Sequence, residues 1–178
     1  MYLITAYFDE KANRTIQHLI NKVAERTGNS FMTEHQVPPH MTISSIEARN
    51  ADVLKKPFSD LKMEKQLGIT KIRFVSPGQL LPYVHYITPV LNNELLELSQ
   101  TVYEKMSGIP ETTISRLYRP GSWLPHVTIG KTLNKEQMLV AFQVLQDSFV
   151  PFDATIEELG LSCVNPHRDV ERFYLENR

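Results

Sequence analysis

The chain contains the phrase Pro39-His40-Met41-Thr42-Ile43 and, 86 positions later, the phrase Pro125-His126-Val127-Thr128-Ile129. Each copy places aliphatic and β-branched residues after a proline, which is typical of the start of a strand. Side chains at positions i and i+2 of a strand point to the same face. His40 and Thr42 are therefore expected to share one face of a strand, and so are His126 and Thr128. The spacing is close to half of the 178 residues and indicates two matching halves.

Hydrophobic periodicity and turn residues predict the same order of elements in each half: strand, helix, motif strand, helix, strand. In the first half the strands are expected near 2–8, 40–46 and 69–75, with a helix over 11–27 capped by Gly28, a short helix or loop near 53–61 and a turn at Pro77-Gly78. In the second half they are expected near 83–88, 126–130, 155–164 and 170–175, with helices over 91–106 and 134–147 and a turn at 165–167. This order predicts an α+β protein with one domain made of two pseudo-symmetric lobes, roughly 1–80 and 81–178, between which strands can be exchanged.

Composition excludes several functional classes. The net charge of −1 argues against a protein that coats long duplex nucleic acid, because such binding depends on many Lys and Arg contacts to phosphates. Cys163 is the only cysteine, so neither an internal disulfide nor a four-thiolate metal site is expected. Residues 1–8 are too short for the apolar core of a signal peptide, and no stretch reaches the length of a membrane span. We therefore expect a cytoplasmic monomer without membrane contact.

If the two halves pack with their polar faces inward, two histidines face each other across a cleft, and this arrangement predicts acid–base chemistry. The unperturbed pKa of histidine is about 6.5, so its side chain donates or accepts protons near neutral pH. Phosphodiester cleavage and opening of a cyclic phosphate need a base on the attacking oxygen and an acid on the leaving oxygen, on opposite sides of phosphorus. His40 and His126 suit these two roles, and Thr42 and Thr128 suit hydrogen bonds to the other phosphate oxygens. The sequence leaves open which histidine is the base.

The connection before the second motif is longer than the one before the first. It runs 18 residues from Gly108 to His126, against 12 from Gly28 to His40. Long connections often carry function. Arginine can pair with phosphate through two bonds, and tyrosine and tryptophan can stack on a base. We therefore predict substrate-binding roles for residues of this segment, namely Arg116, Tyr118, Arg119 and Trp123. Packing of the aromatic residues on the core is the alternative.

No metal or cofactor is expected. The chain has no His-x-His, no HExxH and no second cysteine, although Asp and Glu side chains brought together by folding could complete a metal site. It also lacks a P-loop, a dinucleotide-binding glycine motif and a nucleophile elbow. Among the other histidines, His18, His35 and His167 are expected to be solvated, and His85 to lie in the core or at a sheet edge.

The paired His-x-Thr motifs, on a duplicated α+β chain of this length, resemble the 2H phosphoesterase superfamily. The run from Tyr118 to Ile129 is similar to the bacterial 2′-5′ RNA ligase-like branch. This resemblance implies two antiparallel sheets with outer helices around a central cleft, which the histidines line. It implies metal-independent action on 2′,3′-cyclic phosphates, 1″,2″-cyclic ADP-ribose phosphate or 2′-5′-linked oligonucleotides. Several members have an arginine just after the second motif, and here Lys131 is expected to supply that charge to the substrate.

The leading hypothesis is therefore a metal-independent phosphoesterase that acts on a small nucleotide or an RNA terminus. The alternative is a catalytically silent module that binds a nucleotide or an RNA end. A metal-dependent hydrolase is the third possibility. The natural substrate, the position of the phosphate in the product, the direction (ligation or hydrolysis) and the oligomeric state are not specified by the sequence.

Overall fold

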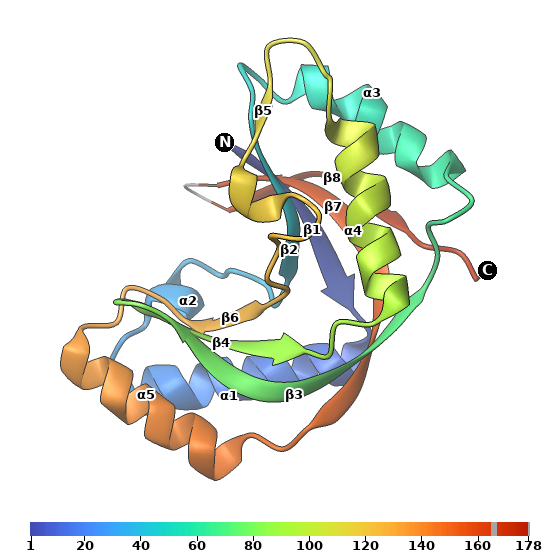
Figure 1. Cartoon of the computed structure of the whole chain (residues 1–178). Helices are drawn as coiled ribbons and strands as arrows, with labels where there is room; N and C mark the ends of the chain where they lie inside the picture. Colours follow the sequence, from blue (N-terminus) through green and yellow to red (C-terminus); the bar gives the residue numbers. More distant parts are fainter. Residues whose placement is uncertain (165–166, 178) are drawn as a thin grey trace.

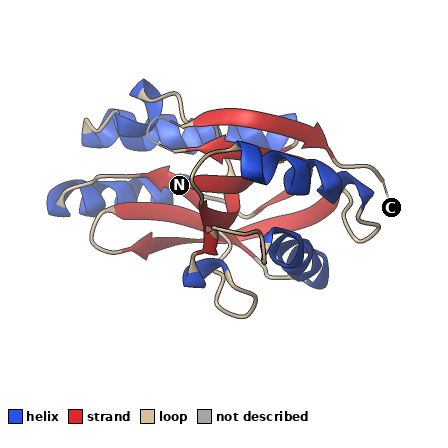
Figure 2. Cartoon of the chain, turned by 90° about the horizontal axis from the view of Figure 1, so that it is seen from above, coloured by secondary structure: helices blue, strands red, loops and turns tan. Residues whose placement is uncertain are grey.

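A computed structural model describes residues 1–164 and 167–177. Strands occupy the middle of the molecule and helices lie on its outside (Figures 1 and 2). The strands are β1 (Tyr2–Phe8), β2 (Met41–Glu47), β3 (Thr70–Leu80), β4 (Val84–Pro89), β5 (Thr113–Ile114), β6 (Val127–Gly130), β7 (Phe152–Cys163) and β8 (Arg168–Tyr174). The helices are α1 (Glu10–Thr27), α2 (Phe31–Glu34), α3 (Asp52–Asp60), α4 (Asn93–Met106) and α5 (Lys135–Ser148), with short 3₁₀ turns η1 (Leu61–Met63) and η2 (Arg116–Tyr118). The predicted α+β class is confirmed.

One antiparallel sheet connects the whole molecule. Seven strands follow the order β1-β2-β6-β4-β3-β7-β8, and β5 pairs with the outer part of β2. Strand β7 also pairs with β1, so β1, β2, β6, β4, β3 and β7 form a closed ring of paired strands. The family resemblance implied two sheets, whereas the strands here form one. The two parts are joined because β2 pairs with β6 through Met41 and Val127, and because β7 pairs with both β1 and β3.

Four of the helices pack in two pairs, and each pair combines one helix from each half of the sequence. Helix α1 packs against α5, and α3 packs against α4, on opposite sides of the sheet (Figure 1). Helix α1 illustrates why these segments are helical. Its N-cap Asp9 accepts a hydrogen bond from the backbone N–H of Ala12, and it ends at Gly28, whose positive φ of 65° suits glycine. Helix α5 starts with the predicted capping box of Asn134 and Gln137.

The predicted turn at Pro77-Gly78 is wrong, because β3 continues through both residues to Leu80. The outer half of β3 pairs with β4, whereas β7 pairs only with the inner half, Thr70 to Phe74. Beyond Phe74, the side of β3 that faces β7 has no strand partner among the described residues and needs no backbone N–H donor, so proline is tolerated at position 77. Gly78 lies in the strand as the partner of Tyr86 on β4, and glycine suits this position because a side chain there would collide with the Tyr86 ring. The other predicted turn includes Asn165 and Pro166, which lie outside the described residues.

A single hydrophobic core lies between the helices and the sheet. Both motif strands contribute to it, through side chains that are at most 1% exposed, namely Met41, Ile43, Val127 and Ile129. This burial on one face is what holds the opposite face of β2 and β6 in a fixed position. Within the described part of the chain, none of the helices combines the length and the apolar composition needed to cross a membrane.

Candidate active site

The two motifs lie side by side at the centre of the sheet. Met41 of β2 and Val127 of β6 are direct Cα partners, and both point into the core. His40 and Thr42 flank Met41, and His126 and Thr128 flank Val127, so the four side chains lie on the face opposite the core. All four are half-buried. The structure thus brings together the predicted pair of histidines and pair of threonines.

The register gives this group an approximate two-fold arrangement. Extending the Met41–Val127 pair by one residue in each direction sets His40 opposite Thr128, and Thr42 opposite His126. Diagonal neighbours on antiparallel strands are roughly 7–8 Å apart, which is the separation expected for the two histidines. One phosphate group can span this distance and accept a hydrogen bond from each side.

Both imidazoles have the same backbone support. Nδ1 of His40 donates to the carbonyl oxygen of Pro38 over 2.7 Å, and Nδ1 of His126 donates to that of Leu124 over 2.8 Å. In each motif a proline separates the histidine from the accepting residue; it fixes its own φ and favours an extended conformation in the residue before it. Because a carbonyl only accepts, the neutral rings carry their proton on Nδ1 and leave Nε2 free for the substrate.

Burial lowers the pKa of both histidines. The pKa of His40 falls to about 4, mainly because burial disfavours the charged ring, and positive charge on His167 or His126 lowers it further. The Pro38 hydrogen bond and the Asp169 carboxylate act in the opposite direction. For His126, burial lowers the pKa and the bond to Leu124 raises it. Both rings are therefore mostly neutral at pH 7 in the free protein.

A tyrosine borders His126. The ring of Tyr86 lies 5.3 Å from that of His126, centroid to centroid, with an angle of 59° between the planes. Tyr86 and Gly78 are Cα partners in the β3–β4 pair, and a Cβ atom on Gly78 would lie 2.4 Å from the Cζ atom of Tyr86. The glycine inside β3 thus allows the phenol to lie across the strand and against His126.

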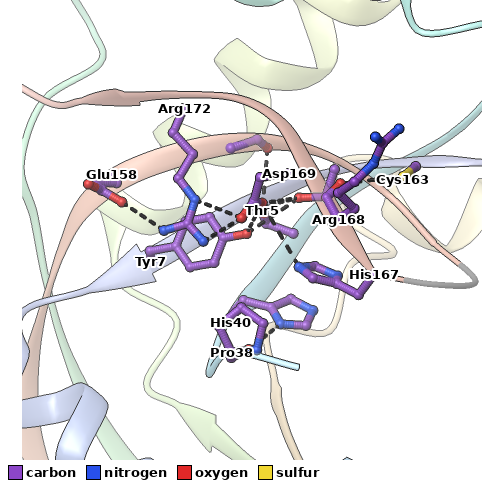
Figure 3. Close-up of polar contacts among 12 residues, drawn as sticks. Thr5, Tyr7, Pro38, His40, Glu158, Cys163, His167, Arg168, Asp169 and Arg172 are labelled. Atoms are coloured by element: carbon purple, nitrogen blue, oxygen red, sulfur yellow. Dashed lines mark hydrogen bonds and ion pairs between the residues drawn. The ribbon is translucent and has the colours of Figure 1, made fainter. Parts of the chain in front are cut away.

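A polar cluster borders His40 (Figure 3). His167 stacks on His40 with 5.0 Å between ring centroids and 24° between the planes. The Asp169 carboxylate lies 3.9 Å from Nε2 of His167 and accepts hydrogen bonds from Tyr7 (2.5 Å) and Ser162 (2.8 Å). The prediction that His167 is solvated was wrong, because its side chain is only 9% exposed. The two histidines are 127 positions apart in the sequence, so no local sequence pattern predicts their contact.

The segment before the second motif folds over β2. Ser115 N–H donates to the Ser45 carbonyl oxygen, and β5 pairs with the end of β2. Trp123 is 8% exposed, and its indole N–H donates to the Thr42 carbonyl oxygen over 3.0 Å. This burial corrects the prediction that Trp123 stacks on a substrate base. Its contacts instead fix the backbone of the first motif.

The other predicted substrate-binding residues differ in their positions. Tyr118 is half-buried next to the first motif; burial raises the pKa of its phenol, and a hydrogen bond with the Thr42 side chain lowers it. Arg116 and Arg119 are exposed at the two ends of η2. Lys131 is exposed just after β6, with its Nζ atom 5.6 Å from the ring centroid of Phe31. Tyr118 is thus the member of this group that reaches the motif residues directly.

The remaining histidines lie away from the motifs. His85 is fully buried, as predicted for a core position, and its Nε2 lies 2.8 Å from the Met138 carbonyl oxygen. His18 is exposed on α1, and His35 is exposed and stacked on Phe31. Within residues 1–164 and 167–177, no group of three or more His, Cys, Asp or Glu side chains is arranged to hold a metal ion.

Comparison with known proteins adds a family assignment. The model of the 2′-5′ RNA ligase superfamily matches residues 36–163, which include both motifs. The fold is similar to that of Escherichia coli LigT in complex with 3′-AMP, with a TM-score of 0.63 and 14% identity over 98% of this chain and 97% of that one. It is also similar to Kluyveromyces marxianus Usb1, with a TM-score of 0.52 and 14% identity over 98% and 97% of the two chains.

The curated proteins contain no match to this sequence. The family match covers well over half of the chain and includes both of the segments that form the paired site. The structural matches, at 14% identity, extend the same fold over nearly the whole chain. The chain therefore belongs to the 2′-5′ RNA ligase superfamily of 2H phosphoesterases.

Proposed function

We propose that this protein is a metal-independent phosphoesterase that opens a cyclic phosphate, or cleaves a 2′-5′ phosphodiester, of RNA or nucleotide origin. The observation that carries the proposal is the matched pair of imidazoles. His40 and His126 have the same Nδ1 hydrogen bond, lie on paired strands and leave Nε2 free on a shared face. We further expect the protein to act as a cytoplasmic monomer.

The two histidines would act as general base and general acid. One accepts a proton from the attacking water or hydroxyl, while the other donates a proton to the leaving oxygen; each role is typically worth about 10²–10⁴-fold in rate. Thr42 and Thr128 would donate hydrogen bonds to the non-bridging oxygens as negative charge increases on them. This division of roles needs one acid and one base on opposite sides of phosphorus, which two diagonal positions on paired strands provide.

The side chains next to the first motif favour a small nucleotide or an RNA end. Tyr118 lies beside Thr42, and the exposed guanidinium groups of Arg116 and Arg119 flank it, so the rim next to the first motif offers a ring and cations to a base and its phosphates. The similar fold of LigT, which was crystallised with 3′-AMP, supports a ligand of this class. We propose that Lys131, at the far end of β6, contacts a more distant part of an RNA chain.

Product analysis by mass spectrometry in the presence of EDTA tests this proposal. The panel contains 2′,3′-cyclic nucleotides, 1″,2″-cyclic ADP-ribose phosphate and 2′-5′ oligoadenylate. We expect turnover of at least one substrate by the wild type and a loss of about 10²-fold or more in His40→Ala and in His126→Ala. His18→Ala is the matched control, because His18 is exposed on α1 away from the motifs.

Three outcomes would contradict the proposal in different ways. Equal rates in the wild type and the two motif variants would refute the roles of the histidines. Activity that EDTA abolishes and a divalent metal restores would indicate a metal-dependent hydrolase. Micromolar binding of a panel compound with no product after long incubation would favour the silent binding module.

A further inference from the structure

The two motif histidines have the same backbone support but different surroundings. The ring of Tyr86 meets His126 at a steep angle of 59°. His40 instead has a second imidazole, that of His167, nearly parallel to it at 24°. Behind His167 lies the Asp169 carboxylate, 3.9 Å from its Nε2 atom. The approximate symmetry of the two motifs is therefore broken on the His40 side.

We propose that His167 is a positioning residue for His40, and that it acts with the Asp169 carboxylate to make His40 the base and His126 the acid of phosphodiester hydrolysis. The inference rests on the proposed function and deepens it. It assigns the two roles that the symmetric motifs leave undecided.

Positioning follows from the contacts of the His40 ring. One edge is held by the bond from Nδ1 to the Pro38 carbonyl oxygen, and one face is covered by His167. Because the His167 side chain is 9% exposed, it also keeps water away from that face. A ring held at an edge and a face has little freedom to tilt, so its Nε2 atom keeps a fixed direction toward the substrate.

The carboxylate behind the stack is itself held in its charged form. Burial raises the pKa of Asp169, but hydrogen bonds from Arg172, Tyr7 and Ser162 together lower it below its ordinary value. The Arg172 guanidinium donates to Asp169 from Nε over 2.9 Å and lies 3.7 Å over the Tyr7 ring. Tyr7 remains a donor, because burial and the Asp169 contact raise its pKa to about 12.

This charge favours one histidine as the base. A base becomes positive as it accepts a proton, and a nearby carboxylate stabilises that charge. Asp169 acts on His40 in this sense, whereas the pKa of His126 is set by burial and the Leu124 hydrogen bond. The titratable and charged groups that face His40 from its surroundings are Tyr7, His126, His167, Asp169 and Arg172. Protonation of either neighbouring histidine opposes protonation of His40.

The proposed step balances as follows for a cyclic phosphate. The step starts with Nε2 of His40 unprotonated and with His126 protonated on both ring nitrogens. The oxygen of water attacks phosphorus, and one water proton passes to Nε2 of His40. The bond between phosphorus and one ribose oxygen breaks, and that oxygen takes a proton from Nε2 of His126. The product is a nucleoside monophosphate, and proton exchange with solvent restores both histidines.

Two measurements on His167→Phe test the inference. Phenylalanine keeps a stacked ring but removes the second titrating imidazole. We expect the NMR titration of His40 to move up by roughly 0.5–1 pH unit, because a repulsive charge is lost. The acidic limb of the pH profile of kcat/KM should move up with it, while the basic limb stays in place. His18→Phe is the matched control, and His167→Ala, which also removes the stack, should lower kcat further.

Asp169→Asn supplies a change of opposite sign. Loss of the carboxylate should move the titration of His40 and the acidic limb of the kcat/KM profile to lower pH. General damage to the site would not shift the His40 titration in opposite directions in His167→Phe and Asp169→Asn. If Asp169→Asn does not fold, Asp169→Ser replaces it. Serine also removes the negative charge and keeps an oxygen that accepts hydrogen bonds from Tyr7 and Arg172, so the His40 titration should again move to lower pH.

The outcomes separate the inference from the proposed function, because the NMR titration requires no turnover. An unchanged His40 titration in His167→Phe would overturn the positioning contact. A substrate with a p-nitrophenolate leaving group tests the base assignment, because this group departs without an acid. On it the loss of rate in His126→Ala should shrink while the loss in His40→Ala remains, and the reverse pattern would make His40 the acid and overturn the assignment. A shifted titration with no turnover on any substrate would refute the proposed function and the base assignment, and would support the positioning contact alone.

Discussion

Substitution of Gly78 by alanine should damage the site through Tyr86 while leaving the fold intact. The new Cβ atom would lie 2.4 Å from Cζ and 2.5 Å from the hydroxyl oxygen of Tyr86, whereas ordinary contact begins near 3.4 Å. The ring must therefore move by roughly 1 Å, away from a position in which it packs 5.3 Å from His126. A displacement of about 1 Å near a reacting group can cost up to about 10²-fold in rate.

The stability cost should be small, because the atoms that collide belong to the far end of a half-buried side chain. Overpacking usually costs about 1–3 kcal/mol, and the change from glycine to alanine recovers about 0.4–1 kcal/mol by restricting the unfolded chain. We expect a net loss of about 1 kcal/mol, which corresponds to a fall of roughly 2–4 °C in Tm for a chain of this size. We expect kcat/KM to fall about 10–100-fold.

A double-mutant cycle tests this reasoning. Gly78→Ala, Tyr86→Ala and the double variant are compared in kcat/KM on the substrate that the product screen identifies, and in Tm by calorimetry. Because the three atoms nearest to the new Cβ all belong to Tyr86, Gly78→Ala should have almost no further effect once Tyr86 is alanine. Equal losses from Gly78→Ala in both backgrounds would refute the explanation, since the effect would then not pass through the ring.

Two further predictions concern the first motif. Trp123→Phe removes the indole N–H that donates to the Thr42 carbonyl oxygen. We expect urea unfolding to show a free energy of unfolding lower by about 0.5–1.5 kcal/mol, with KM unchanged. A raised KM at normal stability would instead indicate that Trp123 stacks on the substrate. The pKa of His40 in the folded protein, about 4, lies below the unfolded value, so the unfolded chain binds the proton more tightly and stability should fall as pH decreases from 6.5 to 4. His40 alone is expected to account for up to about 3 kcal/mol of this loss. The Tm of His40→Asn should therefore depend less on pH than the Tm of the wild type. Parallel plots of Tm against pH for the two proteins would contradict the lowered pKa.

Local signals predicted the elements well, because the residues that define them are neighbours in sequence. The capping box at Asn134 and the glycine cap at Gly28 both occur at the expected helix ends. Alternation within the two motifs correctly predicted that Met41 and Val127 face the core while the histidines and threonines lie on the other face. These features depend on backbone periodicity and short-range hydrogen bonds, which a single sequence displays directly.

Features that depend on distant contacts were not predictable in the same way. Gly78 carries the sequence signature of a turn, yet it lies inside β3, which pairs with β4 there, and the Tyr86 ring occupies the space of a side chain at Gly78. Trp123 has the composition of a binding loop, but its indole packs on the backbone of the first motif. His167 lies in the predicted turn, and the pairings of β8 with β7, β7 with β1 and β1 with β2 bring it to His40. In each case the decisive partner lies on another element of the fold.

The closure of the sheet by β7 has a consequence for the order in which the chain can fold. Strand β1 is synthesised first, but one of its edges finds its partner only when residues 156–163 are available. The corresponding edge of β3 waits for residues 152–156. Until then both strands expose unpaired backbone groups, which are templates for association with other chains. Contacts of such long sequence separation also slow folding. A chain truncated before β7 should therefore aggregate.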